Sequence, residues 1–519
     1  MFAPSLLWTA PEINPINNKA RSIPLLNVFC VHGRVFLFSW LGFFIAFWSW
    51  YAFPPLLKSV IAEDLGLSDS QVLTSNVIAL LATLLVRLVA GTACDRFGAR
   101  WTFAGCLLIG ALPTFLAGTA NTFSELCALR FFVGILGGSF VPCQVWTTAF
   151  FDKNVVGTAN SLTAGFGNAG GGVTYFVMPA IYNSLVQNGL TTSQAWRVSF
   201  VVPGILIVSV AILLLLFCPD TPTGKWSERA QAIPRQGSSA PSQGTRVRIA
   251  GSAQSPSPSG NEEKISIGGS IRSSQFHGEK KGNGIESPSD DNEPRIGEQY
   301  EIDAVQQEVI QNPTWKEAMK VVLSPQTLVL AACYSCSFGA ELAVNSILGS
   351  YFGQQIPSLS LQGSGNWAAM FGIMNIVFRP LGGVVADYAY RSTKTVWAKK
   401  ILLHTYCFLT GAFLIAVGLT DPRDLGMLVG LINIGFAFFD EGANGLNFAL
   451  VPHVHSYANG IVSGVTGASG NLGGIIFAIV FRYGGSYARA IWIIGVIIMA
   501  VNVATCWIKP IPKGQIGGR

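Results

Sequence analysis

Long apolar segments recur along the whole chain, and they constrain its fold more than any other feature. A helix needs about 20 consecutive apolar residues to cross the hydrocarbon core of a bilayer. Half of the 519 residues are apolar and only 12% are charged, which is about half the charged share of a typical soluble protein. The sequence therefore predicts a membrane protein with many helical spans.

Twelve segments have the length and composition of a membrane span. In the first half of the chain they cover residues 34–57, 70–93, 101–120, 124–148, 157–184 and 195–218. In the second half they cover residues 325–352, 365–387, 398–419, 424–448, 457–482 and 486–508. The predicted fold class is an all-α membrane protein with twelve transmembrane helices in two six-helix halves.

The segment between the halves has a different composition, rich in Ser, Gly, Pro and charged residues. Such a segment buries too little apolar surface to fold by itself, so we expect it to be largely disordered. The predicted organisation is an N-terminus, a first half, a central loop, a second half and a tail, with limits 1–33, 34–218, 219–324, 325–508 and 509–519.

Basic residues gather in the loops on one side of the predicted membrane. Arg96 and Arg100 follow the second span, Lys153 follows the fourth, and Arg391 follows the eighth. Because Lys and Arg are enriched in cytoplasmic loops, both termini and the central loop are expected to be cytoplasmic. This clustering also accounts for the net charge of +6 without a nucleic-acid partner.

Corresponding motifs recur in the same order in the two halves. Arg87 lies in the second span and Arg379 in the eighth, while GFGNAGGG (165–172) lies in the fifth and GASGNLGG (467–474) in the eleventh. Repeated halves with a binding site between them near the midplane are the usual construction of a secondary transporter.

The two arginines are the strongest candidates for a binding site. A guanidinium inside the bilayer costs a few kcal/mol even on lenient scales, so Arg87 and Arg379 need a partner or a water-filled cavity. A buried pair with a carboxylate is one alternative, and for Arg379 a side chain reaching toward the membrane surface is another. Two arginines facing one cavity suit a small planar oxyanion, because the planar guanidinium donates parallel hydrogen bonds and stays charged.

Other polar and aromatic side chains are expected beside the arginines. Asn168 and Asn471 sit among the glycines, which close helix packing explains in part, and their amides are predicted to face the cavity. Phe47, Tyr334 and Asn345 are candidates for its wall. Asn375 lies one helical turn before Arg379 and is positioned to orient it.

A third motif follows the second span and has a weaker copy after the eighth. It reads Gly91-x-x-x-Asp95-Arg96-x-Gly98-x-Arg100, and the copy reads Gly383-x-x-x-Asp387. An Asp there is able to cap a neighbouring helix and to pair with a basic side chain across the bundle. We therefore expect Asp95, Arg96, Arg100 and Asp387 to form a conformational latch, although ordinary loop charge is the alternative.

These motifs resemble those of a known family. The pattern from Gly91 to Arg100 resembles the loop signature of the major facilitator superfamily, and the two Asn-centred glycine segments resemble the signatures of its nitrate/nitrite porter family, especially the fungal high-affinity members. SWYAFPPLL, NVIALLATLLVRL and VPHVHSYANGIVSG carry the same resemblance. It implies that Arg87 and Arg379 bind the substrate together with Asn168 and Asn471, and that nitrate and nitrite enter by proton symport across the plasma membrane.

Uptake of an anion into a cell also needs a source of energy. The inside-negative potential opposes entry of a monovalent anion by about 2.3 kcal/mol per 100 mV, so we expect coupling to protons. The candidate proton carriers are the intramembrane carboxylates Glu341, Asp440 and Glu441, each of which is alternatively a structural ion-pair partner.

The predicted function is therefore a nitrate and nitrite importer working as a monomer in the lipid bilayer, with protons as the coupling ion. The alternatives are a nitrate/nitrite exchanger, a carrier of another small anion, and a nutrient sensor. No nucleophile and base, metal cluster or cofactor motif is present in the sequence, so neither an enzyme nor a cofactor is expected.

Overall fold

The computed structural model describes residues 7–15, 17–228, 314–359 and 361–513. Most of the central segment, whose disorder the sequence predicts, lies outside these residues, as does the end of the tail. The described part is helical, with only isolated β-bridges, which confirms the predicted fold class.

The helices of the first half begin and end close to the predicted spans. Two of the spans are built from two helices each: α6 and α7 are joined by a 3-10 turn at Gly134–Ser139, and α9 runs into α10. The bounds are α1 (Val31–Trp50), α2 (Pro54–Leu56), α3 (Ala62–Leu65), α4 (Asp69–Phe97), α5 (Ala99–Phe115), α6 (Phe123–Val133), α7 (Phe140–Phe150), α8 (Val156–Gln187), α9 (Thr192–Ser199) and α10 (Val201–Phe217).

The second half repeats this arrangement. Its fourth span is again composite, because a π-helical stretch at Gly430–Phe436 joins α17 to α18. The bounds are α13 (Trp315–Val322), α14 (Pro325–Gln355), α15 (Leu361–Thr393), α16 (Val396–Thr420), α17 (Leu425–Val429), α18 (Ala437–Leu450), α19 (Asn459–Tyr483) and α20 (Tyr487–Thr505). Among the described residues, eleven helical segments are long and apolar enough to cross a membrane, and α8, with 32 residues, is a further long helix.

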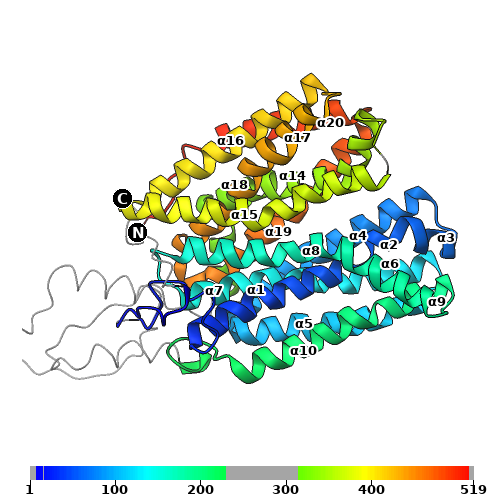
Figure 1. Ribbon diagram of the computed structural model, residues 1–519. Coiled ribbons are helices and arrows are strands. Elements are labelled where there is room, and N and C mark those ends of the chain that lie inside the picture. The colour runs from blue at the N-terminus through cyan, green and yellow to red at the C-terminus, as the bar shows by residue number, and fades with distance from the viewer. Residues whose placement is uncertain (1–6, 16, 229–313, 360, 514–519) are drawn as a thin grey trace, which may run out of the picture.

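The two halves lie side by side, with the first and last described residues toward the same end of the molecule (Figure 1). Four helices make the main contact between them: α8 packs along α15, and α4 packs along α19. Within each half the outer layer is formed by the equivalent pairs α5 with α10 and α16 with α20. The fold thus places the helices that carry Arg87, Arg379, Asn168 and Asn471 at the interface between the halves.

Glycine makes the closest part of this interface possible. A Cβ on Gly91 of α4 would lie 2.5 Å from the Gly460 carbonyl oxygen, and one on Gly464 of α19 would lie 2.8 Å from the Arg87 carbonyl oxygen. Both distances are too short for a side chain, so only glycine allows the two backbones to approach this closely.

Large apolar side chains are exposed on the outer helices. Ile205 and Leu216 of α10 and Ile401 of α16 are more than half exposed. Water would disfavour such a surface, whereas the acyl chains of a bilayer suit it. The outer faces of both halves are therefore the membrane-facing surface.

One part of the predicted central loop is ordered. Helix α13 begins at a capping box in which Thr314 and Glu317 satisfy each other's backbone N–H groups, an arrangement that favours helix initiation. Its apolar residues Ala318 and Val321 are buried, and the helix packs against α19 and α14. The second half thus begins about ten residues earlier than its first membrane span.

Candidate functional site

The two buried arginines approach the same aromatic rings from opposite halves. Arg87 on α4 is 1% exposed and Arg379 on α15 is fully buried. The guanidinium carbons lie 4.9 and 6.0 Å from the centre of the Phe140 ring, and 5.4 and 5.7 Å from that of Phe338. A cation over an aromatic face is stabilised by the ring quadrupole, more so where water is excluded.

The aromatic rings form a cluster with contributions from three helices. Tyr334 on α14 lies parallel to Phe338, with 5.1 Å between ring centres, and parallel to Phe140 of α7 at 6.3 Å. Phe448 of α18 meets Phe140 and Tyr334 edge-on, at 4.7 and 5.0 Å. We call Phe140, Tyr334, Phe338 and Phe448 the aromatic cluster.

Arg87 is held by backbone carbonyls. Its Nε donates to the Gly137 oxygen at 3.0 Å and its Nη1 to the Gly467 oxygen at 2.8 Å. Gly467 belongs to the second half, so Arg87 bridges the two halves. Within the described residues Arg87 makes no ion pair, and the alternative of a structural carboxylate pair does not apply to it.

Arg379 has side-chain partners. Its Nη2 donates to the Tyr334 hydroxyl at 2.8 Å, and its Nη1 donates to Oδ1 of Asn375 at 3.3 Å. A Glu341 carboxylate oxygen lies 3.8 Å from Nη1, which is a loose ion pair rather than a bidentate one. Nε of Arg379 has no hydrogen-bond partner in the part of the chain that the structure describes.

Glu341 is held by two amides. Asn375 Nδ2 donates to one carboxylate oxygen at 2.7 Å, and Asn444 Nδ2 donates to the other at 2.8 Å. Ser337 donates to Asn444 Oδ1 at 2.7 Å. These bonds connect α14, α15 and α18 in one buried network whose end is the Arg379 guanidinium.

The two signature asparagines differ in their surroundings. Asn471 Nδ2 donates to the Gly467 carbonyl at 3.2 Å, the same oxygen that accepts from Arg87. Asn168 is also buried, but neither of its amide atoms has a hydrogen-bond partner among the described residues. Each asparagine therefore retains polar capacity near the interface between the halves.

Phe47 and Asn345 lie farther from the arginines. Phe47 packs against Phe43, at 5.2 Å between ring centres, and Phe43 in turn packs against Phe140 at 5.3 Å. Phe47 thus lies behind the aromatic cluster rather than in it. Asn345 is half-buried and lies one turn beyond Glu341 on α14.

Asp440 and Glu441 are buried without partners. Both side chains are fully buried on α18, and none of their four carboxylate oxygens accepts a hydrogen bond from the described residues. Of the three candidate proton carriers, only Glu341 belongs to the hydrogen-bonded network around Arg379.

Two aspartates cap helices of the opposite half. Asp95 at the end of α4 accepts from the backbone N–H groups of Gly460 and Ile461 at 2.8 and 2.9 Å, at the start of α19. Asp387 on α15 accepts from the Gly157 and Thr158 N–H groups at 3.2 and 2.6 Å, at the start of α8. An acidic side chain at a helix N-terminus is favoured both by these hydrogen bonds and by the helix dipole.

The basic partners of the aspartates differ from those expected. Lys399 Nζ lies 2.9 Å from Asp387, and both side chains are fully buried. Arg100 pairs with Asp220 within the first half, and Arg96 lies over the ring of Phe97. The expectation that Arg96 and Arg100 join a contact across the halves is therefore wrong for the contacts that the structure describes.

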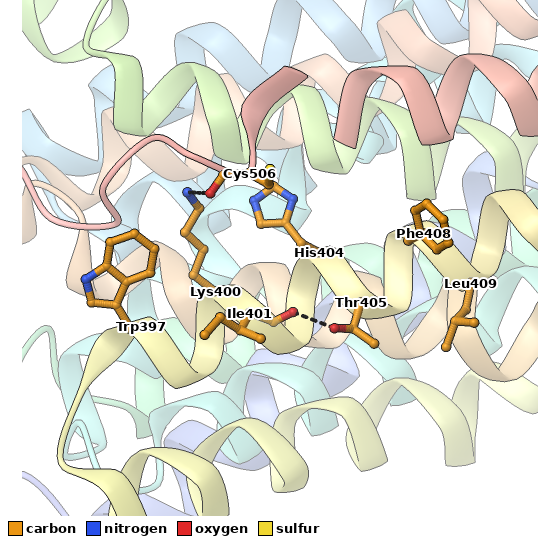
Figure 2. A pocket seen from close by; sticks show the side chains of 8 residues that line it. All are labelled: Trp397, Lys400, Ile401, His404, Thr405, Phe408, Leu409 and Cys506. Carbon is orange, nitrogen blue, oxygen red and sulfur yellow. Dashed lines mark hydrogen bonds between the residues drawn. The ribbon is translucent and has the colours of Figure 1, made fainter. Parts of the chain in front are cut away.

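A groove on the outer surface lies away from these residues. It has a volume of about 400 Å³ on the outer face of α16 and is lined by Trp397, Lys400, Ile401, His404, Thr405, Phe408, Leu409 and Cys506 (Figure 2). Lys400 at its rim donates to the Cys506 carbonyl at 2.9 Å. The lysine thus caps the end of α20.

Sequence comparison identifies the family. The model of the Major Facilitator Superfamily matches residues 39–478, so the chain belongs to this superfamily of transporters. Solved structures agree on the fold: FucP in the outward conformation aligns with a TM-score of 0.56 at 12% identity over 91% of this chain and 99% of FucP. The proton:xylose symporter XylE aligns with a TM-score of 0.57 at 11% identity over 90% of this chain and 94% of that chain.

The curated relatives include one named as an elsinochrome transporter and several named as nitrate transporters. Elsinochrome transporter 1 of Elsinoe fawcettii is 42% identical over 99% of this chain and 100% of its own length. High affinity nitrate transporter 2.5 of Arabidopsis thaliana is 29% identical over 95% of this chain and 82% of its own length. Nitrate/nitrite transporter NrtP of a Picosynechococcus species is 24% identical over 86% and 84% of the two chains.

Proposed function

We propose that this superfamily member carries a small monovalent oxyanion, nitrate or nitrite, into the cell across the plasma membrane by proton symport. The two halves would move about the layer of residues formed by Arg87, Arg379 and the aromatic cluster. The termini would lie on the cytoplasmic side. Asn168, Asn471 and Tyr334 would complete the binding site.

The paired arginines are the observation that carries this proposal. Two guanidinium groups share the faces of two aromatic rings, while Glu341 is the one carboxylate among the described residues that forms an ion pair with either of them, at 3.8 Å from Arg379. With Glu341 ionised, the layer has one positive charge in excess, which a monovalent anion neutralises. The nitrate transporters among its relatives support the same anion.

The surroundings favour an anion that gives up water easily. Aromatic rings flank both cations. Among the described residues, the hydrogen-bond donors left without a partner include Nε of Arg379 and Nδ2 of Asn168. A planar anion with delocalised charge suits such donors because it accepts parallel hydrogen bonds. A strongly hydrated anion such as phosphate would lose more hydration energy than these few donors replace.

A second candidate substrate is elsinochrome. The 42% identity to a protein named Elsinochrome transporter 1, over nearly the full length of both chains, favours it.

Uptake by the purified protein in liposomes separates these candidates. We expect saturable uptake of isotope-labelled nitrate that is stimulated by an inward proton gradient and inhibited by nitrite, but not by phosphate or elsinochrome. Arg87→Lys keeps the charge but loses the planar fork, and we expect its uptake to fall at least roughly tenfold, as for a lost interaction of about 1.4 kcal/mol.

The matched control is Arg482→Lys, at the other end of α19 beside Tyr483, which should transport normally. Normal nitrate uptake by the Arg87→Lys protein would exclude a site in which the planar guanidinium groups of Arg87 and Arg379 both bind the anion. Uptake of elsinochrome without nitrate would establish the second candidate, and nitrate binding without any transport would indicate a sensor.

A further inference from the structure

Two consecutive carboxylates on α18 lack the hydrogen-bond partners that would stabilise a negative charge. Asp440 and Glu441 are fully buried, and none of their oxygens is hydrogen-bonded within the described structure. An isolated ionised carboxylate in such surroundings is so unfavourable that the group takes up a proton instead.

The other buried carboxylates of the described core have partners. Glu341 accepts from two amides and lies near Arg379, Asp387 pairs with Lys399, and Asp95 caps α19. Partners of this kind stabilise the ionised form. Asp440 and Glu441 are therefore a different class of site from the structural and binding carboxylates around them.

The charged and titratable groups that face this pair come from three helices. Helix α15 contributes Arg379, whose guanidinium already interacts with Glu341 and Tyr334. Helix α8 packs against α18 through Asn160 and Ser161, which do not titrate. On α14, α15 and α16 the groups that interact electrostatically with the pair include Cys336, Glu341, Arg379 and Cys407, and the Tyr406 ring lies beside the adjacent Gly442.

We propose that Asp440 and Glu441 are the proton-binding sites of the transport cycle and are both protonated in this conformation, while Glu341 stays ionised as the counter-ion of Arg379. The inference rests on the proposed function, because it assumes that an anion binds at Arg379. It assigns separate roles to three carboxylates that the sequence alone leaves equivalent.

Electrostatics then couples proton and anion. When the pair is protonated, Arg87 and Arg379 face one negative charge, and the layer attracts an anion. When the protons leave to the cytoplasmic solution, two negative charges appear beside Arg379, and they repel the anion from the same guanidinium. By linkage, a bound anion must likewise strengthen proton binding at the pair.

The test compares two modes of transport by the same protein. Asp440→Asn and Glu441→Gln, singly and together, mimic the protonated groups. We expect the double variant to exchange labelled for unlabelled nitrate within about twofold of the wild-type rate. Its accumulation of nitrate under a proton gradient should fall at least about tenfold, because no proton can drive it. Glu63→Gln, an exposed carboxylate outside the helical core, is the matched control and should keep both activities.

A measurement on the wild-type protein guards against misfolded variants. Infrared difference spectra with and without nitrate should show a protonated carboxyl band that shifts in heavy water, and that band should be stronger with nitrate bound. Proton-driven accumulation that persists in the double variant, or the absence of such a band in the wild-type spectra, would overturn the assignment. Failure of the wild-type protein to move nitrate at all would instead refute the proposed function.

Discussion

At the scale of single residues, the chemistry is concentrated where the two arginines meet the aromatic cluster. Arg87 is oriented by carbonyl oxygens and Arg379 by side chains that also hold Glu341. Both guanidinium groups therefore have fixed positions before any ligand binds, which reduces the entropy that binding must offset.

Phe140 is the nearer of the two shared rings to Arg87 and also lies close to Arg379, and its substitution is the first prediction at this scale. Phe140→Leu removes an aromatic face 4.9 and 6.0 Å from the two guanidinium carbons. Each buried cation–π contact contributes about 0.5–2 kcal/mol, so we expect the KM for nitrate to rise roughly tenfold.

The control for this substitution is Phe436→Leu. Phe436 is also fully buried but stacks on Phe371, away from both arginines. It creates a similar cavity, so the two variants should lose similar thermal stability while only Phe140→Leu alters the KM. Equal KM values for the two variants would show that the ring acts through packing alone.

At the scale of helices, the ends of α8 and α19 are capped from the opposite half. Asp387 and Asp95 do this in equivalent ways, but Asp387 also neutralises the buried Lys399. Lys399 Nζ also contacts Nε2 of His453, at 3.1 Å. Asp387 therefore both caps α8 and neutralises the lysine that contacts His453. His455, which lies outside the predicted spans, contacts Ser324 instead. Burial lowers the pKa of its imidazole.

The second prediction follows from this difference between the caps. Asp95→Asn should cost about 1 kcal/mol through the loss of one cap hydrogen bond and the dipole interaction. Asp387→Asn should cost about 3–5 kcal/mol, because it leaves Lys399 buried without a counter-charge. Thermal unfolding of the purified proteins should therefore show the larger decrease in Tm for Asp387→Asn.

A second substitution tests whether the unpaired charge of Lys399 causes this loss of stability. In the double variant Asp387→Asn with Lys399→Met, no uncompensated charge remains, so a large part of the lost Tm should return. If the double variant is no more stable than Asp387→Asn alone, the lost cap rather than the orphaned lysine accounts for the effect.

At the scale of the whole molecule, the halves are joined by contacts between folded helices. Arg87 with Gly467, the two aspartate caps, and Ser161 with the Gly445 carbonyl all cross the interface. These bonds lie on α4, α8, α15, α18 and α19, which pack together along the middle of the molecule (Figure 1).

The third prediction is that the halves assemble when they are separate polypeptides. If the chain is divided within residues 229–313 and both parts are expressed together, a tag on the first part should recover the second from detergent extracts. Gly464→Leu, which places a bulky side chain 2.9 Å from the Gly91 Cα, should reduce that recovery. Halves that never purify together would show that the central segment is needed for assembly.

The spans, the repeated halves and the two arginines could be predicted from the sequence alone. These follow from local properties: the length of an apolar run and the cost of a guanidinium inside it. The sequence also predicted that Asn375 orients Arg379, that Tyr334 lines the cavity and that Glu341 is a candidate proton carrier. The structure brings all three close to Arg379.

Which residues surround the arginines depends on how the helices pack. Phe140, Phe338, Phe448 and Asn444 carry no local signal, because aromatic and small polar residues occur on every face of a membrane helix. The sequence likewise gives no sign that Lys399 pairs with Asp387. Nor does it show that Glu341 has hydrogen-bond partners, whereas Asp440 and Glu441 have none among the described residues. Such differences depend on helix packing between residues far apart in the chain, whereas the composition of one segment decides only whether that segment crosses the membrane.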